Sequence, residues 1–140
     1  MTWEWGAGRG TRLNLLYGGV YGPERAAGST VNSPFFLTLV DSLGVIQVLR
    51  FSGIRYQGPS PVSGSGRTSA PARFSLVGTR EADTVRIEVR VVDVLATEMR
   101  ASQFRRIFLQ MRGQFTLIGK VAGEQVVDSG VGFFETYAVP

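Results

Sequence analysis

The chain has 140 residues, the usual size of one domain and long enough to bury a full hydrophobic core. It contains no cysteine and no histidine, which excludes disulfides, thiolate nucleophiles, Cys/His metal sites and a histidine general base. The formal net charge of +4 comes mainly from scattered arginines, which form no basic stripe and so indicate no nucleic-acid partner. Any chemistry must use carboxylates, arginines, tyrosines, backbone amides or Lys120, the one lysine.

No segment approaches the ~18 consecutive apolar residues that a membrane-spanning helix needs. The N-terminal residues lack the basic start and the long apolar run of a signal peptide. We therefore expect a cytoplasmic protein with no membrane span, no bound metal and no cofactor.

In the N-terminal half, apolar and polar residues alternate with a period of two, and clusters of Gly, Pro, Ser and Asp separate the runs. The glycine-rich residues 6–10 are typical of a flexible turn. Ser52 and Gly53 indicate a kink, beyond which the strand pattern resumes. The pattern predicts strands over residues 2–5, 11–20, 35–40, 45–51 and 54–56.

The C-terminal half continues the alternation, with turns expected at 80–83 and 128–130. Residues 57–72 are rich in Gly, Pro and Ser and are expected to form a loop, either unstructured or a lid over a site. Residues 95–103 are the one segment for which a short helix is an alternative. Strands are predicted over 73–79, 84–94, 104–121, 125–127 and 131–139.

This amounts to about eight to ten antiparallel strands with at most one short helix and no βαβ rhythm, so the expected fold is all-β, in a single domain over residues 1–140. A sandwich and a barrel both fit this count. We favour a barrel because several strands carry polar residues on both faces. A solid sandwich would leave such groups unsatisfied at ~1–3 kcal/mol each, whereas a barrel with a ligand cavity can use them.

Three segments carry a resemblance to a known family. They are Trp3-Glu4-Trp5-Gly6 followed by Leu13-Asn14-Leu15-Leu16-Tyr17-Gly18, then Phe36-Leu37-Thr38-Leu39-Val40-Asp41, and Gly130-Val131-Gly132-Phe133-Phe134-Glu135-Thr136-Tyr137. Together they resemble the C-terminal domain of the carotenoid hydratase-like superfamily, which includes tocopherol-cyclase-like proteins and some Diels–Alder cyclases. The resemblance implies a lipocalin-like antiparallel barrel and a polyene or isoprenoid ligand. Members of that superfamily normally carry two such barrels side by side, and this chain has room for one.

Glu135 is the leading candidate for a catalytic acid. Alternation places it on one face with Phe133 and Tyr137. If that face lines the cavity, burial would raise the pKa of the carboxyl and create an acid able to protonate an alkene or epoxide, with the aromatic rings stabilising the cation. The alternative is a surface Glu135 paired with an arginine. Glu4 is a second carboxylate, which we interpret as exposed, on the face opposite two structural tryptophans.

Other side chains could orient or contact a ligand. Arg112 shares a strand face with Gln110 and could bind a carboxylate or enolate oxygen if that face lines the cavity, although an outward solvated face is an equal alternative. Tyr17 is a candidate hydrogen-bond donor to the ligand. The remaining expected ligand contacts are Trp3, Trp5, Asn14, Tyr56, Gln110, Phe133 and Tyr137.

The hypothesis from sequence is a barrel that binds a hydrophobic small molecule (a polyene, isoprenoid or polyketide) and promotes its cyclisation, hydration or isomerisation. Glu135 would be the acid, and Arg112 and Tyr17 the orienting donors. The alternatives are a noncatalytic carrier and an accessory domain of a two-domain protein, the latter either inert alone or acting as a homodimer whose partner replaces the missing half.

Overall fold

A computed structural model describes residues 2–21, 34–61, 69–101 and 104–138. In these ranges all the regular structure is strand, which confirms the all-β expectation. The helix considered for residues 95–103 is wrong for 95–101, which continue a strand; residues 102 and 103 lie outside the described ranges. The strands are β1 (Thr2–Gly10), β2 (Asn14–Tyr21), β3 (Phe35–Asp41), β4 (Gly44–Phe51), β5 (Arg55–Pro61), β6 (Ser69–Arg80), β7 (Asp83–Ala101), β8 (Phe104–Val121) and β9 (Glu124–Ala138).

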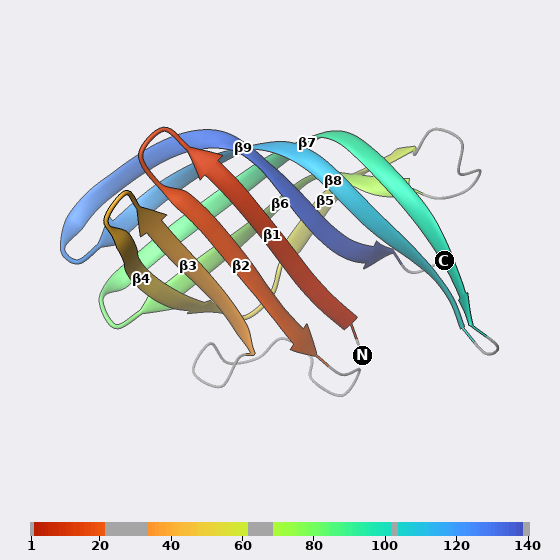
Figure 1. Ribbon diagram of the computed structural model, residues 1–140, viewed down its shortest axis with the longest axis horizontal. Helices are drawn as coiled ribbons and strands as arrows, with labels where there is room; N and C mark the ends of the chain where they lie inside the picture. Colours follow the sequence, from red (N-terminus) through yellow and green to blue (C-terminus); the bar gives the residue numbers. More distant parts are fainter. Residues whose placement is uncertain (1, 22–33, 62–68, 102–103, 139–140) are drawn as a thin grey trace.

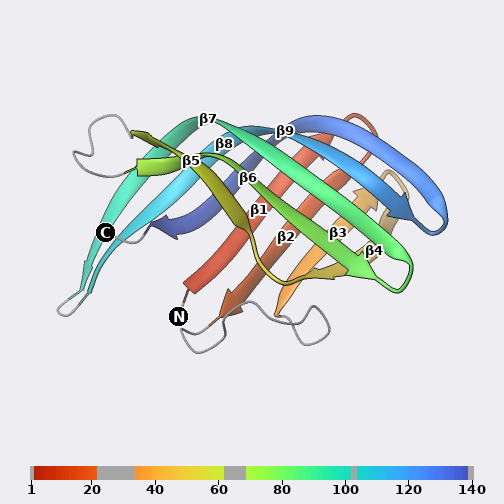
Figure 2. The ribbon, with the colours of Figure 1, turned by 180° about the vertical axis from the view of Figure 1, so that it is seen from behind.

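The strands form a closed antiparallel barrel (Figures 1 and 2). The order around the sheet is β4-β3-β2-β1-β9-β8-β7-β6-β5. The first and last strands of the chain, β1 and β9, are therefore neighbours. A short pairing between β4 and β6, at Arg50 and Thr79, closes eight strands into the barrel. The ninth strand, β5, pairs along the rest of β6, from Arg55 opposite Ser75 to Pro61 opposite Ser69.

β4 and β5 are two parts of one interrupted strand, since both run antiparallel to β6 along the same edge. The chain leaves the sheet between Phe51 and Arg55, which confirms the kink predicted at Ser52-Gly53. The loop expected over 57–72 is wrong at both of its ends, because residues 57–61 belong to β5 and residues 69–72 to β6. Residues 62–68 lie outside the described ranges.

The predicted hairpin turn over 80–83 is confirmed, with Glu81 at φ 54°. The other two turn predictions are wrong. β1 runs through the glycine-rich residues 6–10, and β9 runs through residues 128–130. Asp128 there accepts backbone hydrogen bonds from Thr11, Arg12 and Leu13, and so holds the turn between β1 and β2.

The glycines of β1 face the barrel interior, where aromatic rings occupy the space beside them. A Cβ on Gly6 would lie 2.5 Å from ring atoms of both Phe134 and Tyr17, and one on Gly8 would lie 2.7 Å from Phe115. An eight-stranded barrel has an interior just wide enough for its own side chains. Glycine on β1 is therefore what allows large rings from neighbouring strands to meet inside.

The interior is filled by side chains over most of its length. The fully buried aromatic residues are Tyr17, Phe51, Phe74, Phe115 and Phe134. The Tyr17 ring stacks on the Phe134 ring with centroids 6.0 Å apart, and the Phe74 ring meets Phe134 edge-on at 5.2 Å. The large empty hollow that a spacious lipocalin-like barrel suggests is thus replaced by a packed aromatic core.

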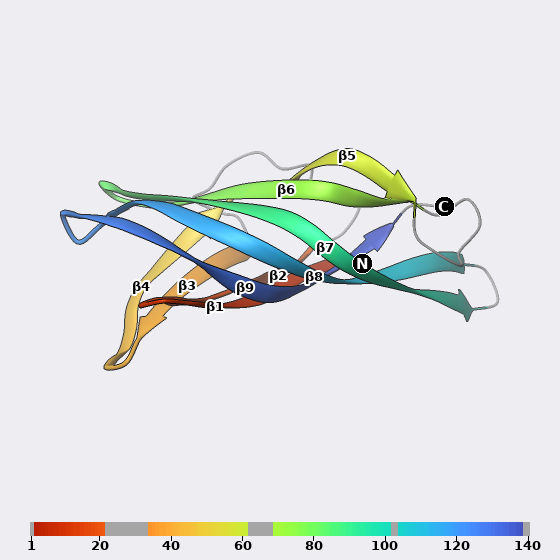
Figure 3. The ribbon, with the colours of Figure 1, turned by 90° about the horizontal axis from the view of Figure 1, so that it is seen from above.

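The barrel wall is open at one end. β6 pairs with β7 only from Arg73 to Arg80, and β6 residues before that pair with β5 alone among the described strands. Figure 3 shows the β5–β6 hairpin and the long β7–β8 hairpin diverging towards this end. This gap gives solvent access to the inner face where the start of β8 lies beside the end of β9.

Candidate functional site

Glu4 lies on the inner face of β1 and only 5% of it is exposed. The sequence interpretation of Glu4 as an exposed residue is therefore wrong. Trp3 and Trp5, which alternate with it, lie on the outer face and are 41% and 37% exposed. The alternation itself was predicted correctly, but the inner and outer faces of β1 were exchanged.

Two hydroxyl groups donate hydrogen bonds to the Glu4 carboxyl. Tyr56 Oη donates to Glu4 Oε2 at 2.5 Å, and Thr136 Oγ1 donates to Glu4 Oε1 at 3.0 Å. The three residues come from β5, β9 and β1. Glu4 and Thr136 meet because β1 and β9 are neighbours in the barrel. Tyr56 reaches Glu4 from β5, which follows the kink after β4.

Burial raises the pKa of Glu4 from 4.5 to about 7, although the hydrogen bonds from Tyr56 and Thr136 act in the opposite direction. At neutral pH this carboxyl is thus close to half-protonated, a state suited to both giving and accepting a proton. Burial, with the nearby Glu4 charge, also raises the pKa of Tyr56 and of Tyr17 well above 10, so both phenols keep their protons.

Tyr17 supplies an unused polar group beside this cluster. Its hydroxyl is fully buried and has no hydrogen-bond partner within the described part of the chain. A buried hydroxyl without a partner costs ~1–3 kcal/mol, so its presence in the core needs an explanation. A ligand or water group that reaches the Glu4 cluster would provide a partner.

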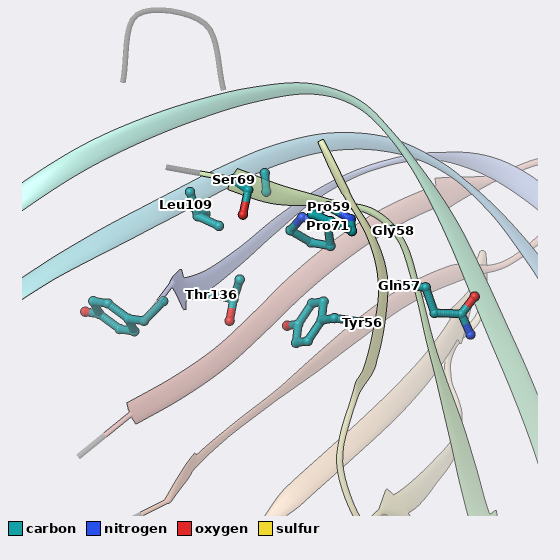
Figure 4. Close-up of a pocket in the computed structure, with 10 residues that line it drawn as sticks. Tyr56, Gln57, Gly58, Pro59, Ser69, Pro71, Leu109 and Thr136 are labelled. Carbon is teal, nitrogen blue, oxygen red and sulfur yellow. The ribbon is translucent and has the colours of Figure 1, made fainter. Parts of the chain in front are cut away.

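A cavity of about 330 Å³ opens to solvent next to Tyr56 and Thr136 (Figure 4). In Figure 4 the hydroxyl end of Tyr56 points towards the Thr136 side chain, and Leu109 lies above the two. The lining residues are Tyr56, Gln57, Gly58, Pro59, Ser69, Ala70, Pro71, Leu109, Thr136 and Tyr137. The same hydroxyls that hold Glu4 therefore border the cavity, and they connect the carboxyl to whatever occupies it.

Glu135, the leading acid from sequence, lies on the outer face of β9. The residues that face inward are Phe134 and Thr136, which are 0% and 4% exposed, so the condition that Glu135 lines the cavity is not met. Its carboxyl accepts a hydrogen bond from Gln110 Nε2 at 3.2 Å. Tyr137, next on the same face, lines the cavity where β9 ends.

Arg112 lies on the exposed outer face of β8 and pairs with Asp93 at 3.6 Å, which corresponds to the outward alternative. Gln110 shares that face, and Asn14 is exposed on β2. Phe133, 42% exposed, lies outside together with both tryptophans. Of the predicted site residues, the structure thus brings Tyr17, Tyr56 and Tyr137 to the Glu4 cluster or its cavity and places the others elsewhere.

Sequence reasoning missed Glu4 and Thr136 as site residues. The available signal was the set of glycines that share a face with Glu4, at positions 6, 8 and 10, because glycines in a strand indicate close approach by other groups. No group of three Asp, Glu, His or Cys side chains that could hold a metal ion occurs among the described residues. Nor does this part of the chain contain a helix long and apolar enough to cross a bilayer.

No protein-family model matches the sequence, and no curated protein matches it by sequence. Among solved structures, the chain is similar to kievitone hydratase from Nectria haematococca, with a TM-score of 0.55 and 16% sequence identity. The match covers 99% of this chain and 40% of the hydratase chain, so this chain spans less than half the length of its structural neighbour. The similarity confirms the lipocalin-like barrel fold expected from sequence.

Proposed function

We propose that the barrel binds a hydrophobic, unsaturated small molecule in the cavity at its open end and adds water across a carbon–carbon double bond, with Glu4 as the source of the proton. The observation that carries this proposal is the hydrogen-bonded cluster of Glu4, Tyr56 and Thr136 at the cavity wall. It combines a carboxyl that holds a proton near neutral pH with two hydroxyls that face the ligand space.

The first step is protonation of the double bond. When Glu4 holds its proton, one of the two hydroxyls, of Tyr56 or Thr136, turns from donating to Glu4 to accepting from it. That hydroxyl gives its own proton to one alkene carbon as it receives the proton of Glu4, and the π electron pair becomes the new C–H bond. The other alkene carbon is left as a cation. The aromatic rings that line the cavity, Tyr56 and Tyr137, favour that cation.

The second step is capture of the cation by water. The water oxygen forms the new C–O bond, and its surplus proton returns through the same hydroxyls to the Glu4 carboxylate, which restores the starting state. Because the cavity opens to solvent, water is at hand to trap the cation, which favours hydration over cyclisation. The hydratase name of the structural neighbour agrees with this reaction class but does not carry the argument.

The cavity also limits the ligand. Its lining combines apolar groups, such as Leu109 and Pro71, with uncharged polar side chains, and among the residues lining it none is a described Lys or Arg. A volume of about 330 Å³ suits a small isoprenoid or prenylated ring and not a long polyene held entirely inside.

The test uses 2-prenylphenol, geraniol and β-ionone as probes in water labelled with heavy oxygen. We expect mass spectrometry to detect at least one product that gains one labelled water. Glu4→Gln should lower the rate at least ~100-fold, because general acid catalysis typically contributes 10²–10⁴. Probe affinity, measured by calorimetry, should change little. Glu135→Gln, which removes a carboxyl from the outer face of the barrel, is the matched control and should keep full activity.

Equal turnover by the Glu4→Gln variant would refute the acid. Binding of a probe with no product from the unmodified chain would leave a carrier in place of a hydratase. Probe affinity that responds to Leu109→Trp, which fills the cavity, would then still locate the binding site.

A further inference from the structure

A second hollow lies on the outer face of the barrel, on the opposite side of the sheet from the Glu4 cavity. Its volume is about 510 Å³. The residues that line it are Trp3, Glu4, Trp5, Gly18, Gly19, Val20, Phe36, Phe133 and Glu135. Apart from Glu4, whose carboxyl lies on the inner face, none of them takes part in the proposed hydration.

The hollow forms beside two consecutive glycines of β2, Gly18 and Gly19. Gly18 pairs with Trp5 and Gly19 pairs with Glu4 in the β1–β2 register, so the floor between the two indoles is backbone. A Cβ on Gly18 would already lie 3.4 Å from the Phe36 ring. On the other side of β1, Glu135 pairs directly with Trp5. The hollow is therefore built from four adjacent strands, β3, β2, β1 and β9, with fixed register, and not from a loop.

Aromatic rings form the walls. The Trp5 and Phe133 rings meet edge to face with centroids 6.4 Å apart. Trp3, Trp5 and Phe133 are each about two-fifths exposed, and such a cluster on an outer surface indicates an interaction site.

One carboxylate stands among these rings without a balancing charge. Within the described ranges Glu135 accepts a hydrogen bond from the Gln110 amide and forms no ion pair. No described arginine or lysine lines the hollow, although the chain has 15 such residues. Elsewhere on this face a cation already lies near an aromatic ring: the Arg106 guanidinium is 5.7 Å from the Tyr137 ring centre.

We propose that this hollow binds an organic cation with apolar substituents, of the quaternary ammonium class. The faces of tryptophan and phenylalanine attract a cation that carries no hydrogen-bond donors, and the Glu135 carboxylate adds charge attraction. Indole and phenyl walls offer no ligands to a bare metal ion, and the carboxylate repels anions. A neutral apolar molecule would gain only the contact with the walls.

The test is direct because Trp3 and Trp5 are the two tryptophans of the chain, so intrinsic fluorescence reports this hollow. The probes are choline and its neutral analogue 3,3-dimethyl-1-butanol, titrated at constant ionic strength. Choline should give a saturable fluorescence change, with an affinity at least tenfold above that of the alcohol. Glu135→Gln should weaken choline binding severalfold. Glu124→Gln, which removes an exposed carboxylate at the far end of the same strand, should leave it unchanged.

Equal affinity for the cation and the alcohol would overturn the proposal, as would no saturable change with choline or no effect of Glu135→Gln. A spectrum that changes with protein concentration before any probe is added would also overturn it, because a second copy of the chain would then cover the face. Sizing in solution identifies that outcome.

Discussion

Replacing Glu4 by glutamine should change how the stability of the chain depends on pH. Glu4 has a pKa of about 7 in the folded chain against an ordinary value of 4.5. At ~1.4 kcal/mol for each pKa unit, ionisation of the buried carboxyl costs the folded state on the order of 3 kcal/mol. Glutamine keeps the size and the acceptor oxygen but never ionises.

The direction follows from the raised pKa. The stability that protonated Glu4 contributes is fully present below pH 4.5, where the folded and unfolded chains both hold the proton. It is lost as pH rises through 7. The unmodified chain should therefore become less stable from about pH 4.5 to 8, and Glu4→Gln should remove most of this decline. The chain has no histidine, so above the range in which ordinary carboxyls titrate only the terminal amine has an ordinary pKa below 8. The ordinary carboxyls titrate alike in the two proteins and cancel in the comparison.

The measurement is urea unfolding, followed by circular dichroism, at closely spaced pH values from 4 to 8. Asp128, whose pKa is about 2, supplies stability that is lost only at lower pH, so it does not enter this window. If the free energy of unfolding changed with pH in the same way for the unmodified chain and for Glu4→Gln, the Glu4 carboxyl would not be buried in its protonated form. The proton donor of the proposed hydration would then be absent.

Three further substitutions test the packing around the site, each by urea unfolding. Asp128→Ala should lower the free energy of unfolding by about 2–4 kcal/mol, because backbone N–H groups of the β1–β2 turn lose their acceptor, whereas Asp93→Ala, in an exposed ion pair, should cost less than about 1 kcal/mol. Similar losses from the two would refute the turn-holding role. Tyr17→Phe should leave stability unchanged or raise it by up to ~1 kcal/mol, while Tyr56→Phe should lower it, and the reverse ranking would contradict the hydrogen bonds described. Gly6→Ala should cost about 1–3 kcal/mol because the new methyl group meets two buried rings, and a neutral effect would mean that the core is loose there.

Much of the fold could be predicted from local sequence. The strand predicted over 104–121 coincides with β8, and the strands predicted over 35–40 and 45–51 agree with β3 and β4 to within a residue at each end. These segments combine regular alternation with a short polar turn, and both signals depend only on neighbouring residues.

The errors lie where distant contacts decide the structure. Residues 6–10 have the composition of a turn, yet they form a strand because rings from β2, β8 and β9 fill the space above their glycines. Asp128-Ser129-Gly130 has a turn composition as well, but Asp128 serves the turn of another hairpin. No local rule contains that information.

The inner and outer faces of β1 and β9 were assigned wrongly for a related reason. Alternation tells which residues share a face, but not which face is inside. Hydrophobicity favours burial of Trp3 and Trp5, and the limited interior of an eight-stranded barrel reverses this preference, because Tyr17, Phe115 and Phe134 already occupy the space. With the faces of β1 and β9 exchanged, the carboxyl beside the cavity is Glu4 and the carboxyl on the outer surface is Glu135.

One strand therefore carries two sites back to back. Glu4 faces the hydroxyls of Tyr56 and Thr136, which border the cavity, whereas Trp3 and Trp5 face the outer hollow with Glu135. The same backbone positions both, since β1 is paired on each side, with β2 and with β9. The two carboxyls can nevertheless be separated chemically, because one is buried among hydroxyls and the other is half-exposed among rings. Glu4→Gln should slow proton transfer and leave choline binding intact, whereas Glu135→Gln should weaken choline binding and leave turnover intact. Failure of either proposal would therefore leave the other standing.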